Sequence, residues 1–222
     1  MVLGGVVLLG IVIFAFNRTA GPMIQPTTDQ SEQQMASLRS FVNAANEASG
    51  IQSGAVFSYS LVSYGNPVNF SIQRCLDEVR CDVVVPTPVA KFQQPSQPSP
   101  DTAEIDSKTN TVISLHRAMP EFDGGEYSSA EVERIARAFL ERVYPEFKTL
   151  EPTLTFEPGM KGTRLNNGNY FFRWDYEKIQ LPDGLTFELT PFIQVSITAG
   201  GFIFGYDNTI PLYQNSLANL PQ

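Results

Sequence analysis

The chain has 222 residues, of which 42% are hydrophobic and 11% aromatic. This is enough apolar material for one or two packed domains, so the composition excludes a largely disordered chain. The formal net charge of −8 argues against a nucleic-acid-binding protein, because phosphates must be met by clustered lysine and arginine.

The first feature along the chain is an uncharged apolar run from Val2 to Phe16. As a helix this run rises about 22 Å, less than the ~30 Å hydrocarbon core, so flanking residues must enter the interface if it spans. We interpret residues 1–20 as a retained signal anchor, that is, a transmembrane helix. A cleaved signal peptide and a buried core helix stay open as alternatives. The interpretation predicts a membrane-anchored protein of the cell envelope, with the bulk of the chain extracytoplasmic.

Two segments follow the apolar run. Residues 21–34 are rich in Pro, Thr, Gln and Ser, which predicts an extended stalk. Residues 35–92 are predicted to form a small α+β region, with an amphipathic helix within Ser31 to Ala48 and a strand within Ala55 to Tyr64.

A boundary is predicted at residues 93–100, where three prolines in QQPSQPSP indicate an extended linker or a long exposed loop. It separates the small amino-terminal region from a carboxy-terminal domain of residues 101–222. Residue-by-residue comparison detects no internal repeat, although both halves run from a helix into strands.

The chain contains two cysteines, Cys75 and Cys81. An even number of cysteines after an export segment predicts a disulfide bond, and a turn over residues 76–80 could close the small ring. Two free buried thiols are the alternative. A metal site is disfavoured because it needs two further ligands, and the sequence offers no second Cys or His pair.

The carboxy-terminal domain begins with a strong helix signal. Ser128 and Glu131 have the spacing of a capping box, and apolar residues then recur with helical period. They are Val132, Ile135, Ala136, Phe139, Leu140 and Val143.

Strands are predicted after this helix, at residues 153–156 and 170–179. In the second segment Tyr170, Phe172, Trp174 and Tyr176 alternate with polar residues, which predicts one buried aromatic face. Pro182-Asp183-Gly184 and Gly200-Gly201 are turn signals between the later strands, which cover residues 185–189, 192–197 and 202–206.

This order of elements resembles the PepSY-like domains of bacterial envelope proteins. The residues that carry the resemblance are Ser129 to Tyr144, Tyr170 to Tyr176 and Phe192 to Tyr206, within roughly residues 127–210. The resemblance implies an α+β fold of one helix on an antiparallel sheet. It also implies an exported, non-enzymatic module that restrains peptidases or takes part in envelope interactions, with no catalytic residues to carry over.

Candidate catalytic residues are few. The single histidine, His116, has no G-x-S-x-G motif to accompany it, so we expect a structural or surface role. Asp175 and Glu177 could meet Glu188 across a hairpin as a carboxylate cluster for acid–base chemistry, but strand alternation favours a solvated face. Asp101, Glu104 and Asp106 are expected in a solvated acidic loop, with weak calcium binding as the alternative.

We therefore predict no catalytic, cofactor-binding or metal-ligating residues, and a protein partner of unknown identity. The predicted function is a membrane-anchored binding or peptidase-restraining module. Two rival hypotheses are a tethered or secreted hydrolase with a cryptic acidic site and a structural component of a surface assembly.

Overall fold

The computed structural model describes residues 27–51, 57–76, 79–96, 99–119, 126–161, 168–176, 185–187 and 191–218. The apolar segment of residues 2–16 lies outside these ranges, so the signal anchor stays a prediction. Within the described ranges, no helix combines the length and the apolar character that a membrane span requires.

The first helix, α1 (Thr28–Ala48), begins inside the segment that was predicted to be a stalk. Its start is set by Thr27, whose side chain accepts a hydrogen bond from the backbone N of Gln30 at 3.2 Å. The stalk prediction for residues 21–34 is therefore corrected from residue 28 onward, because Thr at an N-cap followed by Gln and Glu favours a helix. The helix ends at Ala48, and Gly50 follows the C-cap residue Ser49 with a left-handed φ of 69°.

The amino-terminal half continues as an antiparallel meander of four strands. They are β1 (Ser60–Leu76), β2 (Val79–Gln94), β3 (Asp101–Asp106) and β4 (Thr111–His116).

The linker predicted at residues 93–100 is corrected by the pairing of β2 with β3. Gln93 and Gln94 are the last residues of β2 and pair with Thr102 and Asp101. Pro95 and Pro100 lie between these two paired strands, where they leave the hydrogen-bond ladder intact. Residues 101–116 therefore belong to the same meander as β1 and β2, and no break between sheets occurs at 93–100.

The carboxy-terminal half repeats the order of a helix followed by strands. Its elements are α2 (Ser129–Val143), α3 (Phe147–Leu150), the 3-10 turn η1 (Glu151–Thr153), β5 (Leu154–Lys161), β6 (Tyr170–Tyr176), β7 (Leu185–Phe187), β8 (Phe192–Ile197), β9 (Ile203–Asn208) and α4 (Ile210–Ala218).

The capping box predicted at the start of α2 is confirmed. The backbone N of Glu131 donates to Ser128 Oγ at 3.3 Å, and the backbone N of Ser128 donates to Glu131 Oε2 at 2.8 Å. The predicted orientation of β6 is confirmed as well, because Tyr170, Phe172 and Trp174 are buried against the core.

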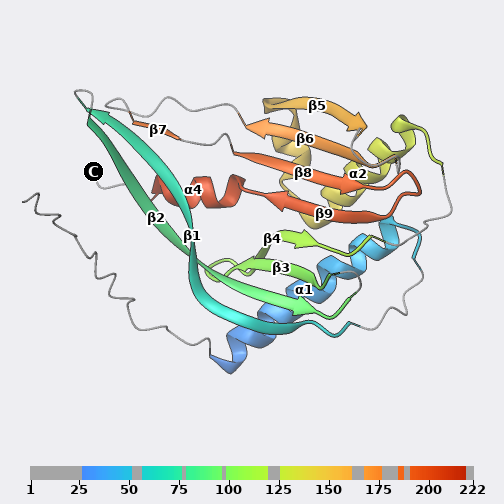
Figure 1. The fold of residues 1–222 in the computed structure, drawn as a ribbon, viewed down its shortest axis with the longest axis horizontal. Coiled ribbons are helices and arrows are strands. Elements are labelled where there is room, and N and C mark those ends of the chain that lie inside the picture. The colour runs from blue at the N-terminus through green and yellow to red at the C-terminus, as the bar shows by residue number, and fades with distance from the viewer. Residues whose placement is uncertain are drawn as a thin grey trace, which may run out of the picture.

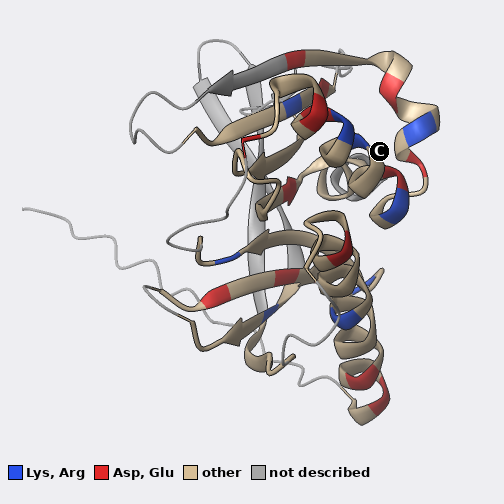
Figure 2. Cartoon of the chain, turned by 90° about the vertical axis from the view of Figure 1, so that its right-hand side faces the viewer, with Lys and Arg blue, Asp and Glu red and all other residues tan. Residues whose placement is uncertain are grey.

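All nine described strands form one sheet, in the order β5-β6-β8-β9-β4-β3-β2-β1-β7, and every pair of neighbours is antiparallel. In Figure 1 the long β1–β2 hairpin pairs beside β3 and then curves along one end of the molecule to β7. Figure 2 shows α1 and α2 together on one side of the sheet. The predicted α+β class is thus confirmed.

The two halves are related by an internal two-fold arrangement. Each half contains a helix and a four-stranded meander, with β7 as an addition in the second half, and the halves join where β4 pairs with β9. We call this three-rung ladder the seam; its central rung pairs Leu115 with Tyr206. The rungs on either side pair Ser114 with Asp207 and His116 with Gly205, as a two-fold axis through the central rung requires.

A matching irregularity supports this relation. The β3–β4 ladder has a register shift between Glu104 and Ile105, and the β8–β9 ladder has one between Ser196 and Ile197. Superposing Leu115 on Tyr206 brings these two bulges to the same position. The structure therefore contains an internal repeat that the sequence comparison did not detect.

The two helices meet near this axis. Phe41 of α1 and Phe139 of α2 pack edge to face with ring centroids 5.4 Å apart, and both contact the ring of Tyr206 on β9. Arg142 of α2 also forms an ion pair with Glu47 of α1. One continuous core thus underlies both halves.

Candidate binding face of the sheet

The face of the sheet opposite α1 and α2 carries two rows of aligned side chains, which we call the open face. One row crosses six strands in register: Arg173, Gln194, Asp207, Ser114, Glu104 and Lys91. The neighbouring row is Phe171, Ser196, Gly205, His116, Thr102 and Gln93. Because each row draws on both halves of the chain, this surface exists only in the folded molecule.

The charged side chains of the open face are paired. Lys91 Nζ lies 2.6 Å from Glu104 Oε1, and Arg173 Nη2 lies 2.7 Å from Asp175 Oδ1. Cations therefore flank the row, with carboxylates nearer its centre. Such a surface offers directional contacts with little net charge, which favours protein partners over polyanions.

Aromatic rings add apolar area to the same face. Phe171 and Phe204 pack edge to face with centroids 6.0 Å apart, and the guanidinium carbon of Arg173 lies 3.8 Å from the ring centre of Phe192. All three phenylalanines are partly exposed. The aromatic face predicted for residues 170–176 is the opposite one, where Tyr170, Phe172 and Trp174 are buried and Tyr176 is partly buried.

Gly205 allows β8 and β9 to pack closely within the second row. A Cβ at this position would lie 2.9 Å from both Cβ and Oγ of Ser196. Ser196 therefore fills the space that a side chain at residue 205 would need, and it is itself buried.

His116 lies across the seam from Asp207, with Nε2 and Oδ1 3.2 Å apart. The hydrogen bond to Asp207 raises the pKa of His116 above its ordinary value, partly opposed by desolvation, and Glu104 adds a smaller upward effect. The neighbouring Ser196 is too buried to serve as an accessible nucleophile. The imidazole and carboxylate thus act as a cross-strand ion pair when His116 is protonated, in keeping with the surface role expected for His116.

Asp207→Asn is expected to lower the pKa of His116, because the variant removes the carboxylate that stabilises the imidazolium. The measurement is an NMR pH titration of the C2 proton, which is unambiguous in a chain with one histidine. Since the folded pKa lies above the unfolded value of about 6.5, the pair stabilises the protein fully below that pH. The contribution is lost as pH rises through the folded pKa.

Glu104→Gln is the matched control, because its influence on His116 is weaker than that of Asp207. A larger fall in the pKa for Glu104→Gln than for Asp207→Asn would contradict the assignment.

A partly buried polar cluster lies at the end of the seam, where α1 meets β3, β4 and the β8–β9 turn. Arg117 Nη2 donates to Asn46 Oδ1 at 2.7 Å, and its Nη1 donates to the carbonyl oxygen of Ile203 at 3.2 Å. The guanidinium carbon also lies 4.4 Å from the ring centre of Phe202. Burial lowers the pKa of Arg117, partly opposed by Tyr59 and Asp101. The cluster therefore fixes the two halves to each other.

The acidic residues of β3 differ from the solvated loop that was expected. Asp101 is 7% exposed and accepts a hydrogen bond from the backbone N of Ala118 at 2.9 Å. Asp106 is fully buried and accepts from the backbone N of Lys108 at 2.9 Å. Both carboxylates accept hydrogen bonds from backbone N–H groups, and no group of metal-ligating side chains occurs among the described residues. The loop prediction is thus corrected for these two residues.

The carboxylate cluster proposed for a hydrolase is only partly described. Asp175 lies on the open face and bonds to both Nε and Nη2 of Arg173. Glu177 and Glu188 lie outside the described residues.

The two predicted disulfide partners lie on the β1–β2 hairpin. The register pairs Cys75 with Arg80 and Arg74 with Cys81, so the cysteines occupy adjacent rungs of the ladder. The disulfide remains a prediction. It predicts no reactive thiol in the unfolded, unreduced chain, and a titration with a thiol reagent that finds two thiols per chain would refute it.

Of the comparisons with known proteins, the one with solved structures found a match. No protein-family model and no curated protein sequence matches the chain. Among solved structures, the Bacillus megaterium YpeB C-terminal domain matches with 10% sequence identity and a TM-score of 0.43, over 82% of this chain and 67% of that chain. The helix-then-strands order on which the PepSY-like resemblance of residues 127–210 depends is the order observed from α2 to β9.

Proposed function

We propose that this protein is a membrane-anchored, extracytoplasmic module of the cell envelope that binds a protein partner through its open face. The observation that carries the proposal is the surface of paired charges across six strands, together with three partly exposed phenylalanines on β6, β8 and β9. Protein interfaces combine such rings and arginines with a polar rim. A peptidase whose activity the module restrains is the kind of partner that the PepSY-like resemblance suggests.

The chemistry of the described residues supports a non-enzymatic role. His116 is held by Asp207, Asp175 is held by Arg173, and Ser196 is buried beside Gly205. General acid–base catalysis needs a titrating group within reach of a substrate and an activated nucleophile or water. Within the described ranges, these groups are instead engaged with one another.

Partner capture tests the binding face. The full chain, solubilised from membranes of the source organism, is expected to retain a partner. Phe171→Lys and Gln194→Arg should each reduce the amount of partner retained at least about tenfold, because each buries a new cation in the contact. Lys148→Glu on α3, which is exposed on another part of the surface, is the matched control. If the wild type and all three variants retained the partner equally, the open face would be refuted as the binding surface.

Fractionation tests the anchoring independently. We expect the full chain to sediment with membranes and to be released by detergent but not by high salt, because apolar insertion is insensitive to ionic screening. Release by salt alone would refute the anchor.

Substrate panels test the hydrolase rival. We expect no turnover of peptidase or glycosidase substrates by the full chain. Turnover that Asp175→Asn or Glu188→Gln abolishes would overturn the non-enzymatic proposal.

A further inference from the structure

We propose that the outward face of α2 is a contact between two copies of this chain, related by a two-fold axis. This surface lies on the helix side of the sheet, away from the open face, so the proposal does not depend on the partner discussed above. The evidence is a hollow on α2, the exposed charges around it, and their self-complementary spacing.

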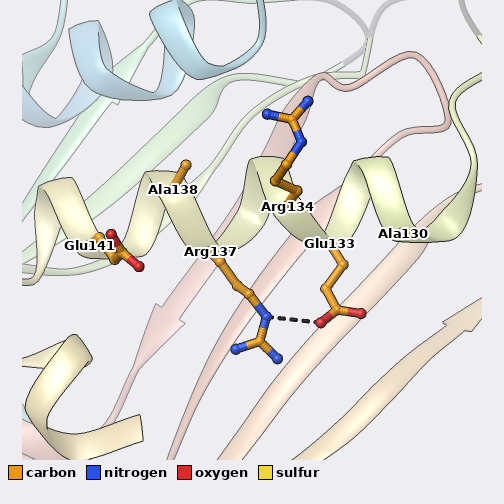
Figure 3. Close-up of a pocket in the computed structure, with 6 residues that line it drawn as sticks. All are labelled: Ala130, Glu133, Arg134, Arg137, Ala138 and Glu141. Atoms are coloured by element: carbon orange, nitrogen blue, oxygen red, sulfur yellow. Dashed lines mark hydrogen bonds and ion pairs between the residues drawn. The ribbon is translucent and has the colours of Figure 1, made fainter.

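The hollow runs along the outside of α2 and has a volume of about 380 Å³. Figure 3 shows the six residues that line it: Ala130, Glu133, Arg134, Arg137, Ala138 and Glu141. They lie opposite the buried stripe of Val132, Ala136, Phe139 and Leu140. Ala130 and Ala138 are exposed and have short side chains, so the backbone of a second helix can approach closely between the longer charged ones.

The charges around the hollow are of two kinds. Arg137 is committed within the molecule, since it forms ion pairs with Glu133 and Glu151 and lies over the rings of Phe156 and Trp174. Arg134 and Glu141 are exposed, and neither forms an ion pair within the described part of the chain. Figure 3 shows both side chains clear of the Glu133–Arg137 pair.

The spacing of these two charges is self-complementary. They are seven residues apart, or about two helical turns, and so project from the same side of α2. When two copies of α2 pack antiparallel about an axis between residues 137 and 138, Arg134 faces the partner's Glu141. The same axis places Glu141 opposite the partner's Arg134. A two-fold contact requires such a self-complementary patch, whereas an unrelated partner does not.

The size of this contact predicts a weak dimer. The helix has 15 residues and is therefore about 22 Å long, so one helix pair buries less than the ~1,200 Å² at which stable interfaces begin. Copies confined to one membrane surface meet at a raised effective concentration, which favours a contact of this strength.

The experiment measures the dissociation constant of the full chain in detergent by sedimentation equilibrium at low salt, from micromolar to near-millimolar concentration. Arg134→Glu and Glu141→Arg should each weaken the dimer at least about tenfold, because each places two like-charge pairs across the axis. The double variant Arg134→Glu/Glu141→Arg should restore the dissociation constant to within about threefold of the wild type, because both pairs are then re-formed with exchanged signs.

Three results would overturn the proposal: a monomeric wild type throughout this range, a dimer that neither single variant weakens, or a double variant that stays as weak as the single ones. An association driven by the apolar residues 2–16 alone would give the second result. Lys148→Glu, an exposed change outside the hollow, should leave the dissociation constant unchanged. All positions are on the surface, and circular dichroism of each variant confirms its folding.

Discussion

Phe139→Ala is expected to lower the free energy of unfolding by about 3–5 kcal/mol. The ring of Phe139 is 1% exposed and packs edge to face against Phe41 and Tyr206, with centroids 5.4 and 5.9 Å away. Phe139 thus joins α2 to β9 of its own half and to α1 of the other half. Removing it leaves a cavity that the surrounding rings, fixed by both halves, fill only in part. The loss is a large share of the ~5–15 kcal/mol by which domains are usually stable.

Phe171→Ala is the matched control for this prediction. Phe171 lies on the open face of β6, is partly exposed, and packs against the ring of Phe204. We expect a clearly smaller loss in urea denaturation of the whole chain. Equal losses, or a larger one for Phe171→Ala, would contradict the assignment of the buried face. The whole chain is required because a fragment of residues 101–222 lacks α1 and so lacks Phe41.

Arg117→Met is expected to lower the free energy of unfolding by about 2–4 kcal/mol, because it removes charge-assisted hydrogen bonds from a partly buried site. Methionine replaces most of the apolar volume of arginine, so the loss in free energy of unfolding measures the contribution of the guanidinium group. Asn46 Oδ1 and the carbonyl oxygen of Ile203 then lose their donors. Asn46 is 5% exposed, so water replaces the lost donor poorly.

Arg142→Met is the control, because Arg142 also pairs across the two helices but with a side chain that is 54% exposed. Exposed ion pairs usually contribute about 1 kcal/mol or less. The measurement is thermal or urea unfolding of both variants, which compares their losses in free energy of unfolding. A loss for Arg117→Met no greater than that for Arg142→Met would show that the polar cluster does not hold the halves together.

The elements of the carboxy-terminal half were predictable because their signals are local. The capping box of Ser128 and Glu131 defines the start of α2 within four consecutive residues. The alternation of Tyr170, Phe172 and Trp174 likewise identifies the buried face of β6 without reference to any other strand. Local hydrogen bonding and side-chain period are sufficient at these sites.

The arrangement of the sheet could not be predicted, because it depends on pairing between distant residues. Prolines after Gln94 were interpreted as a domain boundary, yet a strand connection tolerates them equally well. The internal repeat is expressed in matching bulges and in the rungs of the seam, positions where Leu115 corresponds to Tyr206 and His116 to Asp207. Dissimilar side chains serve the same place in the two halves, so sequence comparison finds no signal.

The candidate binding face was missed for the same reason. Lys91, Glu104 and Asp207 lie on three different strands, and only the register of the six strands brings them into one row. Alternation over residues 170–179 did predict one solvated face on that strand. The alternation within a strand does not predict the order of the strands, and that order decides which charges become neighbours.

The pairing of β7 with β1 has a consequence for how the chain is made. Residues 72–74 of β1 find their ladder partners at residues 185–187. At ~5–20 residues per second, a ribosome needs about 6–23 s after residue 74 to complete residue 187. Throughout that interval this edge of the long hairpin lacks its partner strand, and unpaired edges invite association with other chains. Export before folding, or a chaperone that covers the hairpin edge, would protect the nascent protein until its last strands arrive.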